Sequence, residues 1–181
     1  MISRRRTSPK QAPHSRRLRK PRGAVTLEAI AVLPPLLILF IAVLEFGIAI
    51  LTQQAVTSAS LEGARTAARE NATTNIVAAD VLQFLTVHEV TFNTTGTNAV
   101  DDARVIIEVG AAGPVGLAGE RGNTTLPCTP NGGALAANQV RVTVCVRMTN
   151  GANQPVPDWL NSFGFTTVGR NLEVSSLTTF E

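Results

Sequence analysis

The sequence predicts an α+β protein. A long N-terminal transmembrane helix is expected to continue into a small extracytoplasmic head with a second helix and an antiparallel sheet of about four strands. Three observations lead to this prediction: an apolar run near the N-terminus, a block of positive charge in front of it, and the order of the patterns that follow. Helical periodicity comes first and strand-like alternation comes later, which is typical of α+β folds.

The apolar run extends over residues 24–51, and its middle, residues 29–44, has no charged or neutral polar side chain. At about 1.5 Å per residue a helix over 24–51 would be about 42 Å long, enough to cross a hydrocarbon core of about 30 Å with some tilt. We therefore expect Glu28 and Glu45 near the two faces of the bilayer. Pro34 and Pro35 lack the N–H groups that a helix needs, so we expect a kink there.

The charge of the first residues predicts the orientation of this span. Residues 1–22 hold nine of the sixteen basic residues and no acidic one. By the positive-inside rule this end stays in the cytoplasm and the head lies outside it. Ser15, Arg16 and Arg17 could also begin a twin-arginine export signal, but basic residues follow them where such a signal has apolar ones. Export with cleavage after the helix is therefore the weaker interpretation. The predicted organisation is a basic cytoplasmic leader at 1–23, the transmembrane helix at 24–51, its extracytoplasmic extension at 52–70 and the head at 71–181.

Beyond the span, periodicity predicts the elements of the head. Small residues recur every four positions over 52–69, as in Ala55, Ala59 and Gly63, and such a stripe suits close packing on the chain's own head or on other subunits. A second helix is predicted at 75–87, with Thr74 or Asn75 as its N-cap. Alternating β-branched residues predict strands at 89–93, 104–109, 140–148 and 172–180.

Residues 110–138 are predicted to form a long loop, and the two cysteines offer a way to hold it. Cys128 and Cys145 have sixteen residues between them. In a head outside the cytoplasm a disulfide is favoured over a metal site. The alternative is that Cys145 is a small buried hydrophobic residue and Cys128 a free thiol. Near the C-terminus, Asp158 is expected to cap a short turn that brings Trp159, Leu160 and Phe163 together in the core.

The N-terminal third carries a recognisable arrangement of residues. A basic leader ends at Gly23, and Glu28, Pro34, Glu45 and Gly47 follow, with an alanine-rich helix and Arg69 after them. Over about 47 residues this order resembles the TadE-like pseudopilins of the tight-adherence pilus system. The resemblance implies that a prepilin peptidase cuts between Gly23 and Ala24, which leaves Glu28 at the fifth position of the mature chain.

Elementary electrostatics gives Glu28 a role that agrees with this resemblance. A new α-amino group is cationic at neutral pH, because the pKa of an α-amino group is ordinarily about 7.7 to 8.0. At the membrane face it can be neutralised by a carboxylate of a neighbouring subunit, which would align one helix with the next. The alternative is that Glu28 only reaches into the lipid headgroups beside the basic leader.

Composition argues against several other functions. After cleavage the chain would hold seven arginines and no lysine against thirteen acids, a formal charge of −6, which disfavours nucleic acid as a partner. Its one histidine would be His88, and no metal-ligand spacing is present. We therefore predict no enzyme activity, no catalytic residue, no metal and no cofactor.

Two functions from different classes follow. The first is a pseudopilin-like structural subunit of a tight-adherence pilus, with the prepilin peptidase, other pilus subunits and the lipid bilayer as partners. The second is an unprocessed single-pass envelope protein that anchors a periplasmic binding domain. Both place the chain in the bacterial inner membrane with its N-terminus in the cytoplasm and its head outside. The first adds incorporation into an extracellular pilus.

Overall fold

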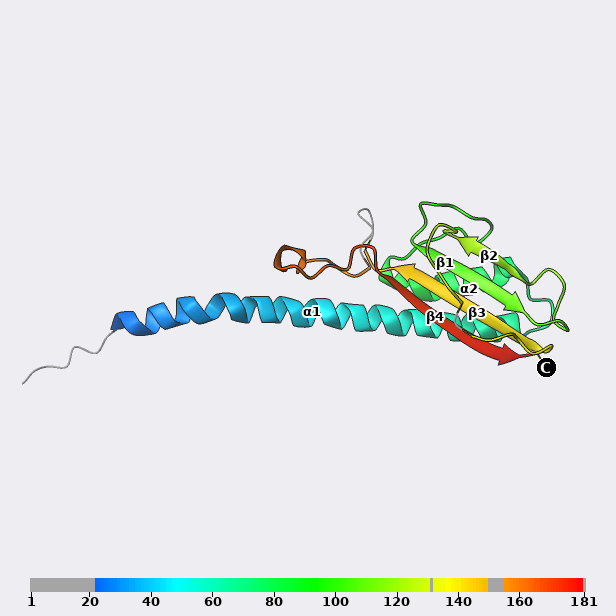
Figure 1. Ribbon diagram of the computed structural model, residues 1–181, viewed down its shortest axis with the longest axis horizontal. Helices are drawn as coiled ribbons and strands as arrows, with labels where there is room; N and C mark the ends of the chain where they lie inside the picture. Colours follow the sequence, from blue (N-terminus) through cyan, green and yellow to red (C-terminus); the bar gives the residue numbers. More distant parts are fainter. Residues whose placement is uncertain (1–21, 131, 150–154, 181) are drawn as a thin grey trace, which may run out of the picture. The chain divides into compact units, whose positions relative to one another are not determined.

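The computed structural model describes residues 22–130, 132–149 and 155–180, so residues 1–21 of the predicted leader over 1–23 lie outside the described residues. The side chains of residues 22–25 are not described either. The chain divides into two compact units, residues 1–37 and 38–181. Figure 1 shows the elements, which in chain order are α1 (Arg22–Ala67), α2 (Thr74–Leu85), β1 (Ala103–Val109), β2 (Gly119–Gly122), β3 (Gln139–Arg147) and β4 (Asn171–Thr179), with short 3-10 turns at Thr86–His88 and Asn161–Phe163.

The prediction of an α+β fold with a long first helix, a second helix and a four-stranded antiparallel sheet is confirmed. The strands lie in the order β2-β1-β3-β4, and each neighbouring pair is antiparallel. On β3 successive side chains point to opposite faces, so Val142 and Val144 face the core while Cys145 faces the other side.

Both helices supply the core on one face of this sheet. The α1 contribution consists of small or β-branched residues, and α2 adds Val77, Val81 and Leu85. These side chains meet the valines of β1 and β3 in one cluster whose members are almost completely excluded from solvent. Burial of this apolar surface is the main force that holds the head together.

One predicted strand is wrong, and the sheet takes a different segment in its place. Residues 89–93 form a turn at Glu89 followed by an irregular stretch, because Glu89 has a φ of 59° and the N–H of Val90 bonds to the carbonyl of Leu85. Val90 and Phe92 are nevertheless buried, which explains the strand-like alternation. The strand that replaces the predicted one is β2, which lies inside the predicted loop and pairs with β1. Its sequence, GERG, has no β-branched residue, so alternation could not reveal it.

The second helix begins one residue earlier than predicted. Its N-cap is Thr73, whose Oγ1 accepts from the N–H of Ile76. Thr74, one of the two predicted caps, is instead buried and donates to the carbonyl of Leu117 at 3.0 Å, which ties the helix to the chain before β2. Asn75, the other predicted cap, lies inside the helix.

Candidate functional site

The first half of α1 has its apolar side chains exposed. We call residues 26–44 the inner segment; no side chain in it is buried, and Leu27, Leu36 and Val43 are 72%, 62% and 62% exposed. Among the described residues, α1 is the one helix long and apolar enough to cross a membrane, by length and composition. Large exposed apolar side chains in such a run are typical of a surface that faces lipid.

The predicted processing residues lie at the start of this helix. Gly23 and Ala24 fall in its first turn, and the carboxylate of Glu28, one turn further on, is exposed. Glu28 is therefore accessible to a charge on another molecule. α1 continues as helix through Pro34 and Pro35. The cleavage at Gly23, the role of Glu28 and the kink stay predictions.

Glu45 is the first buried residue among the side chains of α1 that the structure describes, with 6% of its surface exposed. Its Oε2 accepts the backbone N–H of Leu160 at 3.1 Å. The sequence places Glu45 at the end of the uncharged run but gives no sign of this contact, because the two residues are 115 positions apart. A carboxylate that satisfies a backbone donor is well suited to hold a loop against a helix.

The second half of α1 packs on the head. We call residues 52–67 the outer segment, and it buries Val56, Ala59, Ala64 and Ala67. The small-residue stripe was compatible with packing on the head or on other subunits, and in this structure it packs on the head. The close approach of α1 to α2 requires small residues, since a Cβ on Gly63 would lie 2.7 Å from Cγ2 of Val81.

Two hydroxyl groups add specific bonds to this packing. Ser60 Oγ donates to the carbonyl of Val142 at 2.9 Å and lies 2.9 Å from the hydroxyl of Ser176. Thr66 donates to Asp80 at 2.7 Å, which joins α1 to α2. By contrast, Glu62 pairs with exposed Arg65 of its own helix at 3.4 Å and with exposed Arg69, just beyond the helix, at 3.9 Å, and such surface pairs add little stability.

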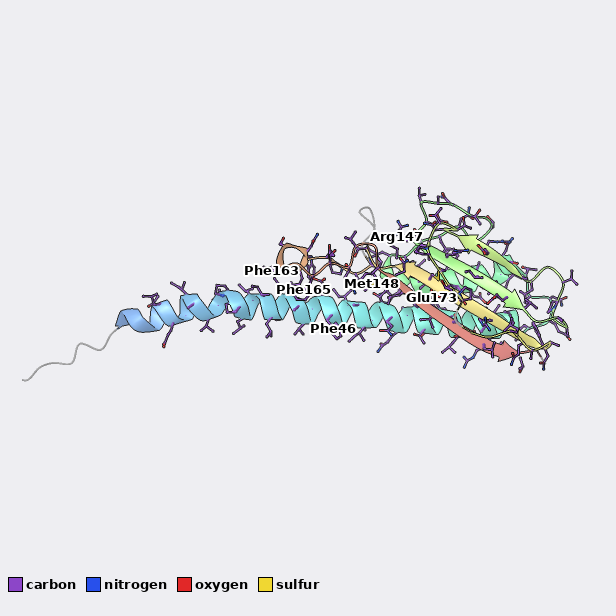
Figure 2. The ribbon with its side chains drawn as sticks, in the orientation of Figure 1. Phe46, Arg147, Met148, Phe163, Phe165 and Glu173 are labelled. Carbon is purple, nitrogen blue, oxygen red and sulfur yellow. A yellow bond between two sulfur atoms is a disulfide. The ribbon has the colours of Figure 1, made fainter. Side chains whose placement is uncertain are left out.

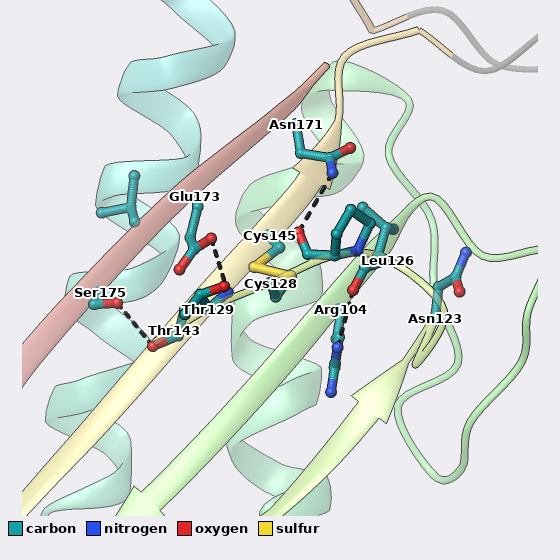
Figure 3. Close-up of a disulfide and its surroundings, with 12 residues drawn as sticks. Arg104, Asn123, Leu126, Cys128, Thr129, Thr143, Cys145, Asn171, Glu173 and Ser175 are labelled. Carbon is teal, nitrogen blue, oxygen red and sulfur yellow. Dashed lines mark hydrogen bonds between the residues drawn. A yellow bond between two sulfur atoms is a disulfide. The ribbon is translucent and has the colours of Figure 1, made fainter. Parts of the chain in front are cut away.

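The face of the sheet opposite the helices is covered by the loop that contains Cys128. The structure joins Cys128 to Cys145 of β3, and their Cα atoms are 6.2 Å apart. Figure 3 shows two further ties to this loop, from Arg104 of β1 to the carbonyl of Leu126 at 2.9 Å and from the N–H of Thr129 to Glu173 of β4 at 3.1 Å. Three strands therefore hold one loop, with the disulfide between the two polar contacts.

The C-terminal loop contradicts the prediction of core packing. We call residues 155–170 the aromatic loop; it contains the 3-10 turn Asn161–Phe163, which has no side-chain cap. Asp158 accepts instead from the N–H of Thr167 at 2.9 Å. Trp159 and Phe163 are each 52% exposed, and Leu160 is half-buried. The turn exists, but these aromatic side chains lie on its surface and not in the core.

The N-terminal segment is similar to a known protein family. Residues 23–65 match the family model described as TadE-like protein. The resemblance inferred from the sequence is thereby confirmed over this TadE-like segment, which includes Gly23, Glu28 and Glu45. It covers most of α1 and ends before α2 and the sheet. No curated protein and no solved structure matches the chain.

Proposed function

We propose that this chain is a pseudopilin-like structural subunit of a tight-adherence pilus. A prepilin peptidase cuts it between Gly23 and Ala24, and it assembles through its N-terminal helix. The match of residues 23–65 to TadE-like proteins carries the proposal. The matched segment starts at the residue that would precede the cut, and it contains the whole exposed apolar surface of the inner segment.

The geometry of α1 supports assembly through its inner segment. The head takes up the side chains of the outer segment but buries none of those in the inner segment. The inner segment is therefore available first to lipid and then to the corresponding helices of other subunits. Exposed Glu28 would neutralise the new amino terminus of a neighbour, which fixes the axial position of one helix against the next.

The proposed role is structural and not catalytic, with no cofactor and no metal. The chain acts from the bacterial inner membrane, with its leader in the cytoplasm and its head outside. Its partners are the prepilin peptidase, other pilus subunits and the bilayer. The disulfide between Cys128 and Cys145 supports an extracytoplasmic head, because such bonds persist in oxidising compartments.

Intact mass and N-terminal sequencing of the protein from its native membrane test the processing step. We expect a chain that begins at Ala24 and lacks the basic leader over residues 1–23. A chain that retains Met1 would contradict the proposal and favour an unprocessed envelope protein that anchors a periplasmic binding domain. Gly23→Leu should abolish cleavage. Gly47→Leu is its matched control, because a Cβ there meets no atom within 4 Å.

Glu28 variants test the assembly step separately. We expect Glu28→Ala to insert into the membrane and to be lost from assembled pili, because insertion becomes easier while the charge at the membrane face disappears. Glu28→Asp keeps the charge and should retain part of the assembly. Immunoblots of sheared pili and of membranes give the two readouts. Normal incorporation of Glu28→Ala would refute the pairing of Glu28 with a neighbour.

A further inference from the structure

The aromatic loop presents an unusual amount of apolar surface for a part of the head. Besides Trp159 and Phe163, Phe165 is 69% and Val168 58% exposed. Four large apolar side chains thus face outward within ten residues of sequence. Figure 2 shows Phe163 and Phe165 at the end of the loop that lies farthest from the sheet. An exposed apolar cluster of this kind marks a surface that contacts another apolar phase.

The position of the loop along α1 identifies that phase. The bond from Leu160 N–H to Glu45 holds the loop beside residues 39–49 of the helix. An open, mainly apolar groove of about 750 Å³ lies between them, lined by Leu39, Val43 and Phe46 of α1 and by Phe165 of the loop. The apolar surface of the candidate membrane span therefore continues through this groove onto the loop.

Helix length places this groove at a membrane face. The apolar run begins at Ala24, and the stretch from Ala24 to Glu45 contains 22 residues. At about 1.5 Å per residue it covers about 33 Å, enough to cross a hydrocarbon core of about 30 Å with some tilt. Glu45 then lies where α1 leaves the hydrocarbon on the side of the head. Tryptophan is enriched at that depth, because its ring is apolar and its N–H is polar.

The polar groups of the loop fit the same environment. Asp158 is occupied by the N–H of Thr167 and by Thr166 Oγ1 at 3.1 Å, so its carboxylate has partners within the loop. Arg170 is exposed at the groove, where a guanidinium can meet a lipid phosphate. Exposed apolar side chains, an internally bonded carboxylate and the exposed guanidinium of Arg170 match the chemistry of a phospholipid interface.

We propose that the aromatic loop and the adjoining face of α1 form a second lipid-binding surface, which seats Trp159, Phe163 and Phe165 in the interfacial region of the leaflet nearest the head. The surface rests on α1 being a membrane span. It makes the head a peripheral membrane element and fixes its height above the bilayer.

Trp159 is the only tryptophan of the chain, so its fluorescence reports on this loop alone. The full chain is reconstituted in phosphatidylcholine vesicles whose acyl chains are brominated near the glycerol or near the methyl end. We expect bromine near the glycerol end to quench Trp159 more strongly, and the bilayer to protect Trp159 from aqueous acrylamide. Phe163→Ser combined with Phe165→Ser should reduce the lipid quenching about twofold, because two interfacial anchors are lost.

The matched control replaces two exposed apolar residues outside the loop. Val87 and Val115 are 80% and 105% exposed, and Val87→Ser with Val115→Ser should leave the quenching unchanged. Flotation of each protein with vesicles separates two failures. A chain that does not float overturns the membrane span and this proposal with it, while a floating chain whose Trp159 is quenched only by acrylamide overturns the loop contact alone. Protection that depends on the protein-to-lipid ratio, without quenching by brominated lipid, would assign the surface to a second copy and also overturn the proposal.

Discussion

The two segments of α1 belong to one helix but present opposite surfaces. The inner segment carries large side chains such as Leu36 and Phe40, and they are exposed. The outer segment carries small ones such as Ala59 and Gly63, and they are buried. Hydrophobicity alone would rank the inner segment as the better core element. The size of the side chains decides instead, because only small residues let the helix approach the sheet closely.

The most severe test of this comparison enlarges a residue of the outer segment. At Gly63 a Cβ would lie 2.7 Å from Cγ2 of Val81 and 3.2 Å from Cγ1 of Val142. We expect Gly63→Leu to destabilise the head by about 3 kcal/mol or more, because overpacking forces the core apart. Thermal unfolding in detergent measures the loss. Gly47→Leu, in open space, should leave the unfolding temperature unchanged; equal losses in both variants would contradict the comparison.

A second prediction concerns the face of the sheet that α1 does not cover. Cys128→Ala should lower the free energy of unfolding by about 3 kcal/mol, since the bridge to Cys145 restricts the unfolded chain. Chemical denaturation measures this effect. The wild-type chain should also change its electrophoretic mobility with dithiothreitol, and the variant should not. Thiol labelling of both cysteines without reductant would show that the bridge does not form.

A smaller effect is expected from the hydroxyl that joins α1 to the two C-terminal strands. Ser60→Ala removes a donor from the buried carbonyl of Val142, and we expect a loss of about 1 kcal/mol. Ser58→Ala is the matched control, because Ser58 is exposed on the same segment. Urea unfolding monitored by far-ultraviolet circular dichroism gives both values. A neutral Ser60→Ala would show that packing alone holds the helix to the sheet.

The smallest effect on the head is expected from a substitution in the inner segment. Leu36→Ala should leave the stability of the head unchanged, because Leu36 is 62% exposed and lies outside the hydrophobic cluster. Its cost should appear only in membrane insertion, as about 0.5 kcal/mol. Insertion into microsomes and thermal unfolding separate the two quantities. A lowered unfolding temperature would place Leu36 against the head and overturn the division of α1.

Much of this architecture could be predicted because periodic patterns record burial. The alternation of β3, QVRVTVCVR, identified its strand to within one residue at each end. The same reasoning failed at Val90 and Phe92, which are buried without pairing in a sheet, and at β2, whose pairing depends on backbone groups and not on side chains. A sequence pattern therefore predicts which residues are buried better than it predicts which distant strands pair through hydrogen bonds.

The candidate site likewise contains features that could be predicted from the sequence and features that could not. The positions of Gly23, Glu28 and Glu45 could be recognised because they form a local order along one helix, and the family match includes them. The contact between Glu45 and Leu160 could not, since nothing local marks it. Trp159 and Phe163 were assigned to the core because large apolar side chains are usually buried, a rule that assumes water on every side. Beside a bilayer, where we propose that this loop lies, that assumption fails.

Between Ile38 and Ala67, α1 belongs to the same compact unit as the sheet, and its outer segment supplies part of the hydrophobic cluster. A mechanical force applied along this stretch therefore acts directly on the packing of Val56, Ser60 and Ala64, because this part of the helix is itself packed in the head. Extraction of the subunit from the bilayer would apply force to the folded head itself. The force that a fibre of such subunits withstands would therefore be limited by the packing of Val56 against the valines of the sheet.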